Sequence, residues 1–162
     1  MDRLWAGWRS EYVQGVDDAG EAVCLFCRLP GETDADALIL ERGDLAFSAL
    51  NRFPYTTGHL MVSQYRHAAD FADLTPDERL DVWRLVSRGV EACRTAMGAH
   101  GCNVGANLGR IAGAGVPGHL HLHVVPRWSG DTNFMTTIGE TRVLPEDLAD
   151  TWARLRGVIG DG

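Results

Sequence analysis

Three histidines at alternating positions are the residues whose type and spacing most directly indicate chemistry in this chain. They are His119, His121 and His123, in the stretch GHLHLHVVPRW, and the chain has six histidines in all. Alternate residues of an extended strand share one face, so the three imidazoles are expected to point one way, with Leu120 and Leu122 on the other side. The leucine face can pack in a core, whereas the imidazole face must meet something polar.

Three interpretations of this face are open. A neutral imidazole is a nucleophile near pH 7, because its reference pKa is about 6.5, and flanking imidazoles could bind an anion or orient the central ring. A metal shared by all three is disfavoured, since the outer two would lie about 13 Å apart along a strand while metal–nitrogen bonds are about 2 Å. A pair such as His121 and His123 could still ligate a metal with outside help. The third interpretation is a solvated face without function.

The composition indicates a single globular domain and disfavours several classes of partner. The chain has 162 residues, of which 45% are hydrophobic and 23% charged, and its net charge of −7 argues against a nucleic acid polymer as partner. All fifteen basic residues are arginines, which excludes a P-loop and lysine Schiff-base chemistry. There is no apolar run long enough for a membrane helix and no signal peptide, so we expect a cytoplasmic protein without a membrane partner. Its four cysteines are then expected to be thiols or metal ligands.

The elements that must position the histidines follow from apolar runs and turn residues. Arg42-Gly43-Asp44 has the composition of a hairpin turn between the first two runs. A glycine-rich loop, NLGRIAGAGVPG, precedes the histidines and would present backbone N–H groups to a phosphate. The expected strands are residues 37–44, 45–50, 58–64, 102–109 and 119–127.

A long helix is expected between the third and fourth strands. Thr75 suits the N-cap, Pro76 the first helical position, and Glu78 completes a capping box. We expect its apolar residues, Trp83 and Met97 among them, to lie in the core. A second helix is expected to begin near Pro145. Strands, a long helix and further strands together predict an α+β fold with helices packed on a sheet.

The stretch HLHLHVV resembles the signature of the histidine triad (HIT) superfamily of nucleotide hydrolases and transferases, in which three histidines alternate with apolar residues. NRFPYTTGHLMV and CNVGANLG resemble neighbouring segments of that family. The resemblance implies the HIT fold, an antiparallel sheet of about five strands with a long helix, and a homodimer with a continuous sheet. It divides the chain into an N-terminal arm (1–36), a HIT core (37–130) and a C-terminal extension with a helix (131–162).

The resemblance also implies residue roles. The central histidine of the family attacks the α-phosphate of a nucleotide, which makes His121 the nucleophile and places His123 beside the phosphate. Asn51 is expected to contact the ribose, and Asn107 the phosphate or the scissile region. The expected substrates are dinucleoside polyphosphates or related nucleotide esters, cleaved through a covalent nucleotidyl-histidine.

One departure from the family pattern leaves two alternatives, water and phosphate, for the acceptor of the nucleotidyl group. Many HIT hydrolases carry Gly-Gln-Ser or Gly-Gln-Thr before the histidines, whereas this chain has Ala114-Gly115-Val116. Gly115 opens room on the substrate side and lacks a side chain that could position water. Relatives that use phosphate as the acceptor also lack this glutamine, and they resemble this chain in HVVPRWSGDTNFMTTIG and in the N-terminal Trp-Arg…Tyr segment. A diadenosine polyphosphate phosphorylase is therefore an alternative, as are a nucleotide-binding module without catalysis and a metal-dependent hydrolase.

A Cys-x-x-Cys in the N-terminal arm indicates a second site. Some bacterial HIT proteins and the related galactose-1-phosphate uridylyltransferases hold a structural zinc. The resemblance maps its ligands onto Cys24, Cys27, His67 and His119, a closed Cys2His2 set that would tie the arm to the sheet. The remaining histidine near a strand, His59, is expected to be structural.

Overall fold

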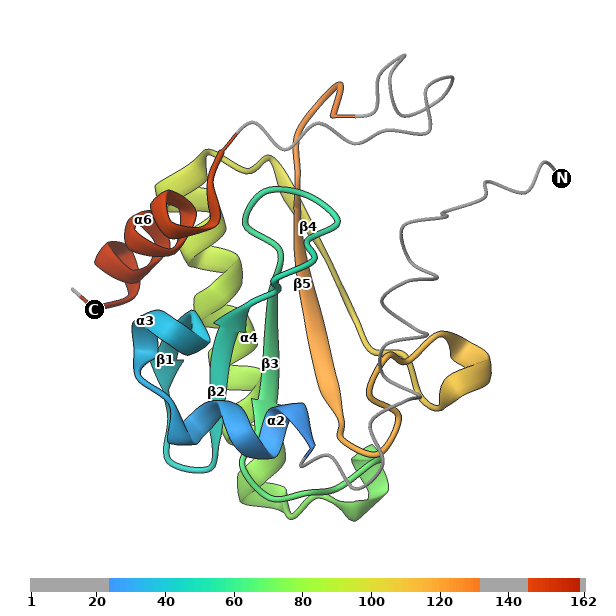
Figure 1. Ribbon diagram of the computed structural model, residues 1–162. Coiled ribbons are helices and arrows are strands. Elements are labelled where there is room, and N and C mark those ends of the chain that lie inside the picture. The colour runs from blue at the N-terminus through green and yellow to red at the C-terminus, as the bar shows by residue number, and fades with distance from the viewer. Residues whose placement is uncertain (1–23, 132–145, 161–162) are drawn as a thin grey trace, which may run out of the picture.

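The computed structural model describes residues 24–131 and 146–160, and in them five strands form one antiparallel sheet in the order β1-β2-β3-β5-β4 (Figure 1). The central strand β3 pairs with both β2 and β5, and Met61 on β3 lies opposite His123 on β5. The N-terminal Trp-Arg…Tyr segment and FMTTIG lie outside the described residues. The strands are β1 Ile39–Arg42, β2 Ala46–Leu50, β3 Leu60–Gln64, β4 Gly101–Gly105 and β5 His121–Arg127.

Two helices cover one face of the sheet, the long α4 (Pro76–Met97) and the C-terminal α6 (Leu148–Gly160) (Figure 1). The capping box expected at the start of α4 is present, because Thr75 accepts from the backbone of Glu78 and Glu78 accepts from the backbone of Thr75. The helix ends at Gly98 in the left-handed conformation that glycine favours. None of the helices in the described part of the chain has the length and apolar character needed to cross a membrane.

The buried face of α4 differs from the expected one. Trp83, expected in the core, is 51% exposed, whereas Asp81 points inward and is buried. The Asp81 carboxylate accepts hydrogen bonds from the backbone N–H groups of Leu45 and Ala46, at the turn between β1 and β2. This polar contact fixes which side of the helix faces the sheet, so the expectation for Trp83 was wrong.

The opposite face of the sheet is covered by the arm that precedes β1. The arm consists of α2 (Leu25–Arg28), the 3-10 turn η1 (Leu29–Gly31) and α3 (Asp34–Ala37). Two further 3-10 turns, η2 and η3, lie at Phe71–Asp73 and Arg110–Ala112. A small apolar cluster joins the arm to β1 and β2, and its buried members are Phe26, Leu29, Ala37, Ile39, Phe47 and Ala49.

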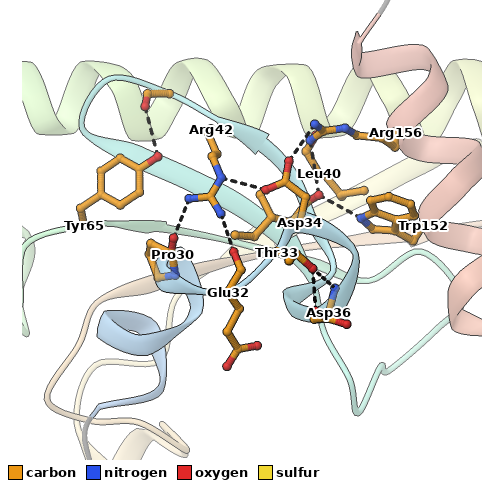
Figure 2. A network of polar contacts seen from close by, with 12 residues as sticks. Pro30, Glu32, Thr33, Asp34, Asp36, Leu40, Arg42, Tyr65, Trp152 and Arg156 are labelled. Atoms are coloured by element: carbon orange, nitrogen blue, oxygen red, sulfur yellow. Dashed lines mark hydrogen bonds and ion pairs between the residues drawn. The ribbon is translucent and has the colours of Figure 1, made fainter.

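Polar contacts hold the end of the arm against the sheet and α6 (Figure 2). The Arg42 guanidinium donates to the carbonyl oxygens of Pro30 and Glu32 and pairs with the Asp34 carboxylate. Arg156 on α6 pairs with the other carboxylate oxygen of Asp34 at 2.8 Å. The arm, β1 and the C-terminal helix are therefore joined at one carboxylate.

The two edges of the sheet differ in what covers them. At the β1 edge, Trp152 and Arg156 of α6 donate to the carbonyl oxygens of Ile39 and Leu40, at 2.9 and 2.6 Å (Figure 2). At the other edge, residues 103–105 of β4 are exposed. Helix α6 thus protects one edge of the sheet from pairing with another strand.

Candidate functional site

His121 begins β5, and its surroundings define which of its nitrogens is reactive. The imidazole is only 5% exposed, and its Nδ1 lies 2.8 Å from the carbonyl oxygen of His119. A carbonyl can only accept, so Nδ1 carries the proton and Nε2 keeps its lone pair. Burial lowers the pKa of His121, and the hydrogen bond to that carbonyl acts in the opposite direction. The structure therefore presents His121 as a neutral imidazole whose Nε2 has no hydrogen-bond partner among the described residues.

His123 is half-buried, and its orientation depends on His59 of the loop before β3. Nε2 of His59 lies 2.9 Å from Nδ1 of His123. The backbone N–H of Tyr55 points to Nδ1 of His59 at 3.1 Å, and a backbone N–H can only donate. His59 therefore accepts at Nδ1 and donates from Nε2 to His123. This leaves the Nε2–H of His123 as a donor, which suits a phosphate oxygen.

Asn51 lies directly after β2 and belongs to the same polar row. Its side-chain amide is 3.3 Å from Nδ1 of His59, and its Oδ1 accepts from the backbone N–H of Phe53. The backbone N–H of Asn51 donates to the carbonyl oxygen of His59, and His123 pairs with Met61, two residues after His59 on the same face of the sheet. The structure thus brings two of the expected site residues together through a histidine that was expected to be only structural.

Asn107 and Gly115 lie in the loop between β4 and β5. Gly105, the last residue of β4, is paired with His123, so Asn107 follows two residues later on the side of His121. The Asn107 amide donates to the carbonyl oxygen of Gly113 at 3.3 Å and so braces the loop. Gly115 is half-buried beside Val116, which packs against the cluster that contains Phe26. Both residues therefore lie in the loop that leads into the histidine strand.

A second group of side chains forms where the arm meets the start of β5. Ligand atoms of Cys24, Cys27, His67 and His119 all lie within 4.8 Å of one another. Nδ1 of His119 is 3.3 Å from Sγ of Cys24, and Nδ1 of His67 is 3.4 Å from Sγ of Cys27. The strand β5 begins at His121, two residues later than expected, and His119 lies in a bend before it. The first histidine therefore faces the arm while the second and third follow the sheet.

The donor set fits a tetrahedral zinc ion, and the close nitrogen–sulfur pairs, at 3.3 and 3.4 Å, have the spacing that such an ion requires. Ligand atoms around such an ion are about 3.3–3.8 Å apart, given zinc–nitrogen and zinc–sulfur bonds of about 2.0 and 2.3 Å. Nε2 of His119 lies 2.9 Å from the carbonyl oxygen of Gln64, so it carries the proton and Nδ1 is left as a ligand. Burial lowers the pKa of His119, which keeps this imidazole neutral as a ligand must be.

The sequence was compared with known protein families. Residues 32–130 match the HIT domain family. The chain belongs to the HIT family. An AP-4-A phosphorylase from Mycobacterium tuberculosis is 36% identical over 167 residues, which cover 95% of this chain and 86% of that protein.

Two further proteins show the range of similarity to this HIT protein. A bis(5'-nucleosyl)-tetraphosphatase (asymmetrical) from Schizosaccharomyces pombe is 31% identical over 93 residues, 57% of this chain and 50% of that protein. A solved Zn-bound histidine triad family protein from Mycobacterium smegmatis superposes with a TM-score of 0.71 at 29% identity, covering 88% of this chain and 96% of that one. The expected fold is confirmed: a HIT fold with five antiparallel strands and a long helix.

Two residues that contact the predicted site histidines were not among the predicted site residues. His59 was expected to be structural, yet it contacts His123, which is 64 positions away in the chain. Phe26 stacks on His121, with 4.7 Å between the ring centroids. A signal for His59 existed, because a polar residue at the start of an apolar strand next to the histidine strand must meet a polar partner. No local signal existed for Phe26.

Proposed function

We propose that this HIT protein cleaves dinucleoside polyphosphates at the α-phosphate through a covalent nucleotidyl-His121 intermediate. The observation that carries this proposal is the free lone pair on Nε2 of a buried, neutral His121. Nε2 attacks the α-phosphorus, a P–N bond forms, and the bond from phosphorus to the leaving polyphosphate oxygen breaks. An acceptor oxygen then attacks the same phosphorus and releases the nucleotide from the histidine.

Phosphate is a serious candidate for this acceptor. The 36% identical mycobacterial protein is named for phosphorolysis, and Gly115 in the loop before β5 has no side chain to position water. With diadenosine tetraphosphate, attack releases ATP and leaves AMP on His121, and inorganic phosphate then produces ADP. Hydrolysis, which would give AMP instead, is the alternative, and the name of the fission yeast relative supports it.

The neighbouring side chains are proposed to bind the substrate around His121. The Nε2–H of His123 is oriented as a donor and is assigned to a phosphate oxygen. Asn51, at the other end of the polar row, is assigned to the ribose. Asn107 and Gly115 are assigned to the scissile region, where the loop Asn107 braces passes beside β5.

A structural zinc is proposed at Cys24, Cys27, His67 and His119. The set is closed, with two thiols and two imidazoles and no fifth group required, which is typical of zinc sites that stabilise a fold. Such an ion would join the arm to the start of β5. His119 would then be withdrawn from proton transfer.

We also propose a homodimer in the cytoplasm. Within the described residues the β4 edge is exposed while α6 covers the β1 edge, so a second copy can extend the sheet at β4 without displacing a helix. Val104 and Leu108 on and after this strand are among the exposed large apolar residues. The described cysteines are all free thiols, as in a reducing compartment.

Incubation with diadenosine tetraphosphate, with and without inorganic phosphate, tests the function. We expect repeated turnover to ADP and ATP only when phosphate is present, and no turnover by His121→Asn, which keeps a side chain of similar reach but no nucleophile. Nucleotide binding should survive in His121→Asn. AMP without phosphate would indicate the hydrolase. Turnover by His121→Asn would contradict the covalent mechanism, and binding without turnover by the wild type would indicate a binding module.

A further inference from the structure

The side chain of Phe26 packs beside the candidate site but has no role in the proposed function. It stands between the two candidate thiol ligands in Cys24-Leu25-Phe26-Cys27, yet its side chain is turned inward and is only 2% exposed. Its ring lies 4.7 Å from that of His121 with 25° between the planes, and 5.5 Å from that of His119 with 52°. One aromatic ring therefore packs against both the candidate nucleophile and a candidate metal ligand.

The stacked contact restricts a motion that the hydrogen bond of His121 leaves open. The bond from Nδ1 to the carbonyl oxygen of His119 fixes one atom of the imidazole, about which the ring can still rock. A flat ring at stacking distance limits this rocking, because the imidazole cannot tilt toward it without overlap. The direction of the Nε2 lone pair is therefore set by Nδ1 and Phe26 together.

We propose that Phe26 is a positioning residue for His121, and that the Cys2His2 cluster sets the position of Phe26. Metal binding and the orientation of the nucleophile are then coupled through one turn of chain. The inference rests on the proposed role of His121. Nucleophilic attack requires the reacting atoms about 3–3.5 Å apart with aligned orbitals, so a tilted imidazole reacts slowly even when substrate binds normally.

The turn that carries Phe26 depends on anchors at both of its ends. Helix α2 has four residues and no side-chain hydrogen bond at its N-cap, Cys24. Such a short helix is not stable by itself. On one side it is held by the cysteine and histidine cluster, and on the other by the contacts of Arg42 and Asp34 shown in Figure 2. Loss of the cluster leaves this turn anchored only by the contacts of Arg42 and Asp34 and by the apolar packing of Phe26 itself.

Phe47 provides a matched control for Phe26. It belongs to the same buried cluster and is 1% exposed, but it stacks on Tyr65 rather than on a histidine, with 5.6 Å between ring centroids. Phe26→Leu and Phe47→Leu remove the same atoms from the same cluster. Both are expected to lower the melting temperature, so a shared loss of stability cannot account for a difference between them.

The test combines turnover of diadenosine tetraphosphate in phosphate with proton NMR of the His121 imidazole, assigned by its absence in His121→Asn. Phe26→Leu is expected to lower kcat about tenfold to a hundredfold with KM within about twofold, whereas Phe47→Leu keeps kcat within about twofold. The His121 ring resonance should move downfield in Phe26→Leu, because the shielding by the stacked ring is lost, and stay in place in Phe47→Leu. Cys27→Ser should move it in the same direction as Phe26→Leu.

An equal fall of kcat in Phe26→Leu and Phe47→Leu would overturn the positioning role, as would an unmoved His121 resonance in Phe26→Leu. A resonance unmoved in Cys27→Ser would overturn the coupling to the cluster. If the wild type does not turn over dinucleotides, the proposed function fails. The NMR shifts then decide the packing of Phe26 on His121 independently.

Discussion

Nε2 of His59 lies 2.9 Å from Nδ1 of His123, and this contact sets the direction in which His123 can donate. His59 is fully buried, and the ring of Tyr55 stacks on it with 4.6 Å between centroids. Because Nδ1 of His59 accepts from the backbone N–H of Tyr55, His59 donates from Nε2, to His123. Its contact with His123 joins this buried residue to the candidate site.

Substitution of His59 by Phe is expected to lower kcat/KM for diadenosine tetraphosphate by about fivefold. The aromatic volume is kept but the donor to His123 is lost, and a hydrogen bond of this kind contributes about 1 kcal/mol. Steady-state kinetics measure the effect. His100→Phe is the control, since His100 is exposed and contacts Ser129 instead. Equal kinetics of His59→Phe and the wild type would show that His123 orients itself without His59.

Much of the fold could be predicted because its signals are local. The capping box at Thr75 and Glu78 and the turn at Gly43 depend on neighbouring residues, and both are present in the structure. The inward side of α4 could not be predicted, because it depends on the contact of Asp81 with a turn 35 residues earlier. The ring that stacks on His121 likewise comes from a segment almost 100 positions away, where Phe26 shows no pattern of its own.

Removal of one thiol is expected to remove the zinc. The wild type is expected to contain one zinc ion after purification and Cys24→Ser almost none. Cys24→Ser should also melt about 10 °C lower or more, because metal binding contributes several kcal/mol to folding. Metal analysis and thermal unfolding measure both. Cys102→Ser is the matched control and should keep the metal, since Cys102 lies outside the cluster. Zinc retained in Cys24→Ser but lost in His121→Asn would favour a catalytic metal instead.

A charge at the β4 edge is expected to prevent dimer formation. Val104 is 41% exposed on this strand, and a lysine there would oppose pairing of the edge with a second copy. Sedimentation at micromolar concentration should give a dimeric mass for the wild type and a monomeric mass for Val104→Lys. Leu80→Lys, on the outer face of α4 where the leucine is 71% exposed, should remain dimeric. A monomeric wild type would exclude this assembly.

The Glu78 carboxylate is expected to make stability depend on acid pH. Arg66 donates to both of its oxygens and the backbone N–H of Thr75 adds a third hydrogen bond, which together hold the pKa of Glu78 at about 2 against the opposing effect of burial. Because the pKa is lowered from 4.5 in the folded protein, the unfolded chain takes up the proton first. The contribution is therefore complete above about pH 4.5 and is lost as the pH falls toward 2.

Glu78→Gln should consequently lower the free energy of unfolding at pH 7 by about 1 kcal/mol, a modest value because Arg66 is half exposed to solvent. The difference from the wild type should shrink as the pH falls from 5 to 3, as measured by urea unfolding at several pH values. Asp77→Asn changes the neighbouring acid in the same turn, where no arginine pairs with it in the described contacts, and should cost only a few tenths of a kcal/mol. A constant difference between Glu78→Gln and the wild type across this range would mean that packing of Glu78, and not its charge, stabilises the start of α4.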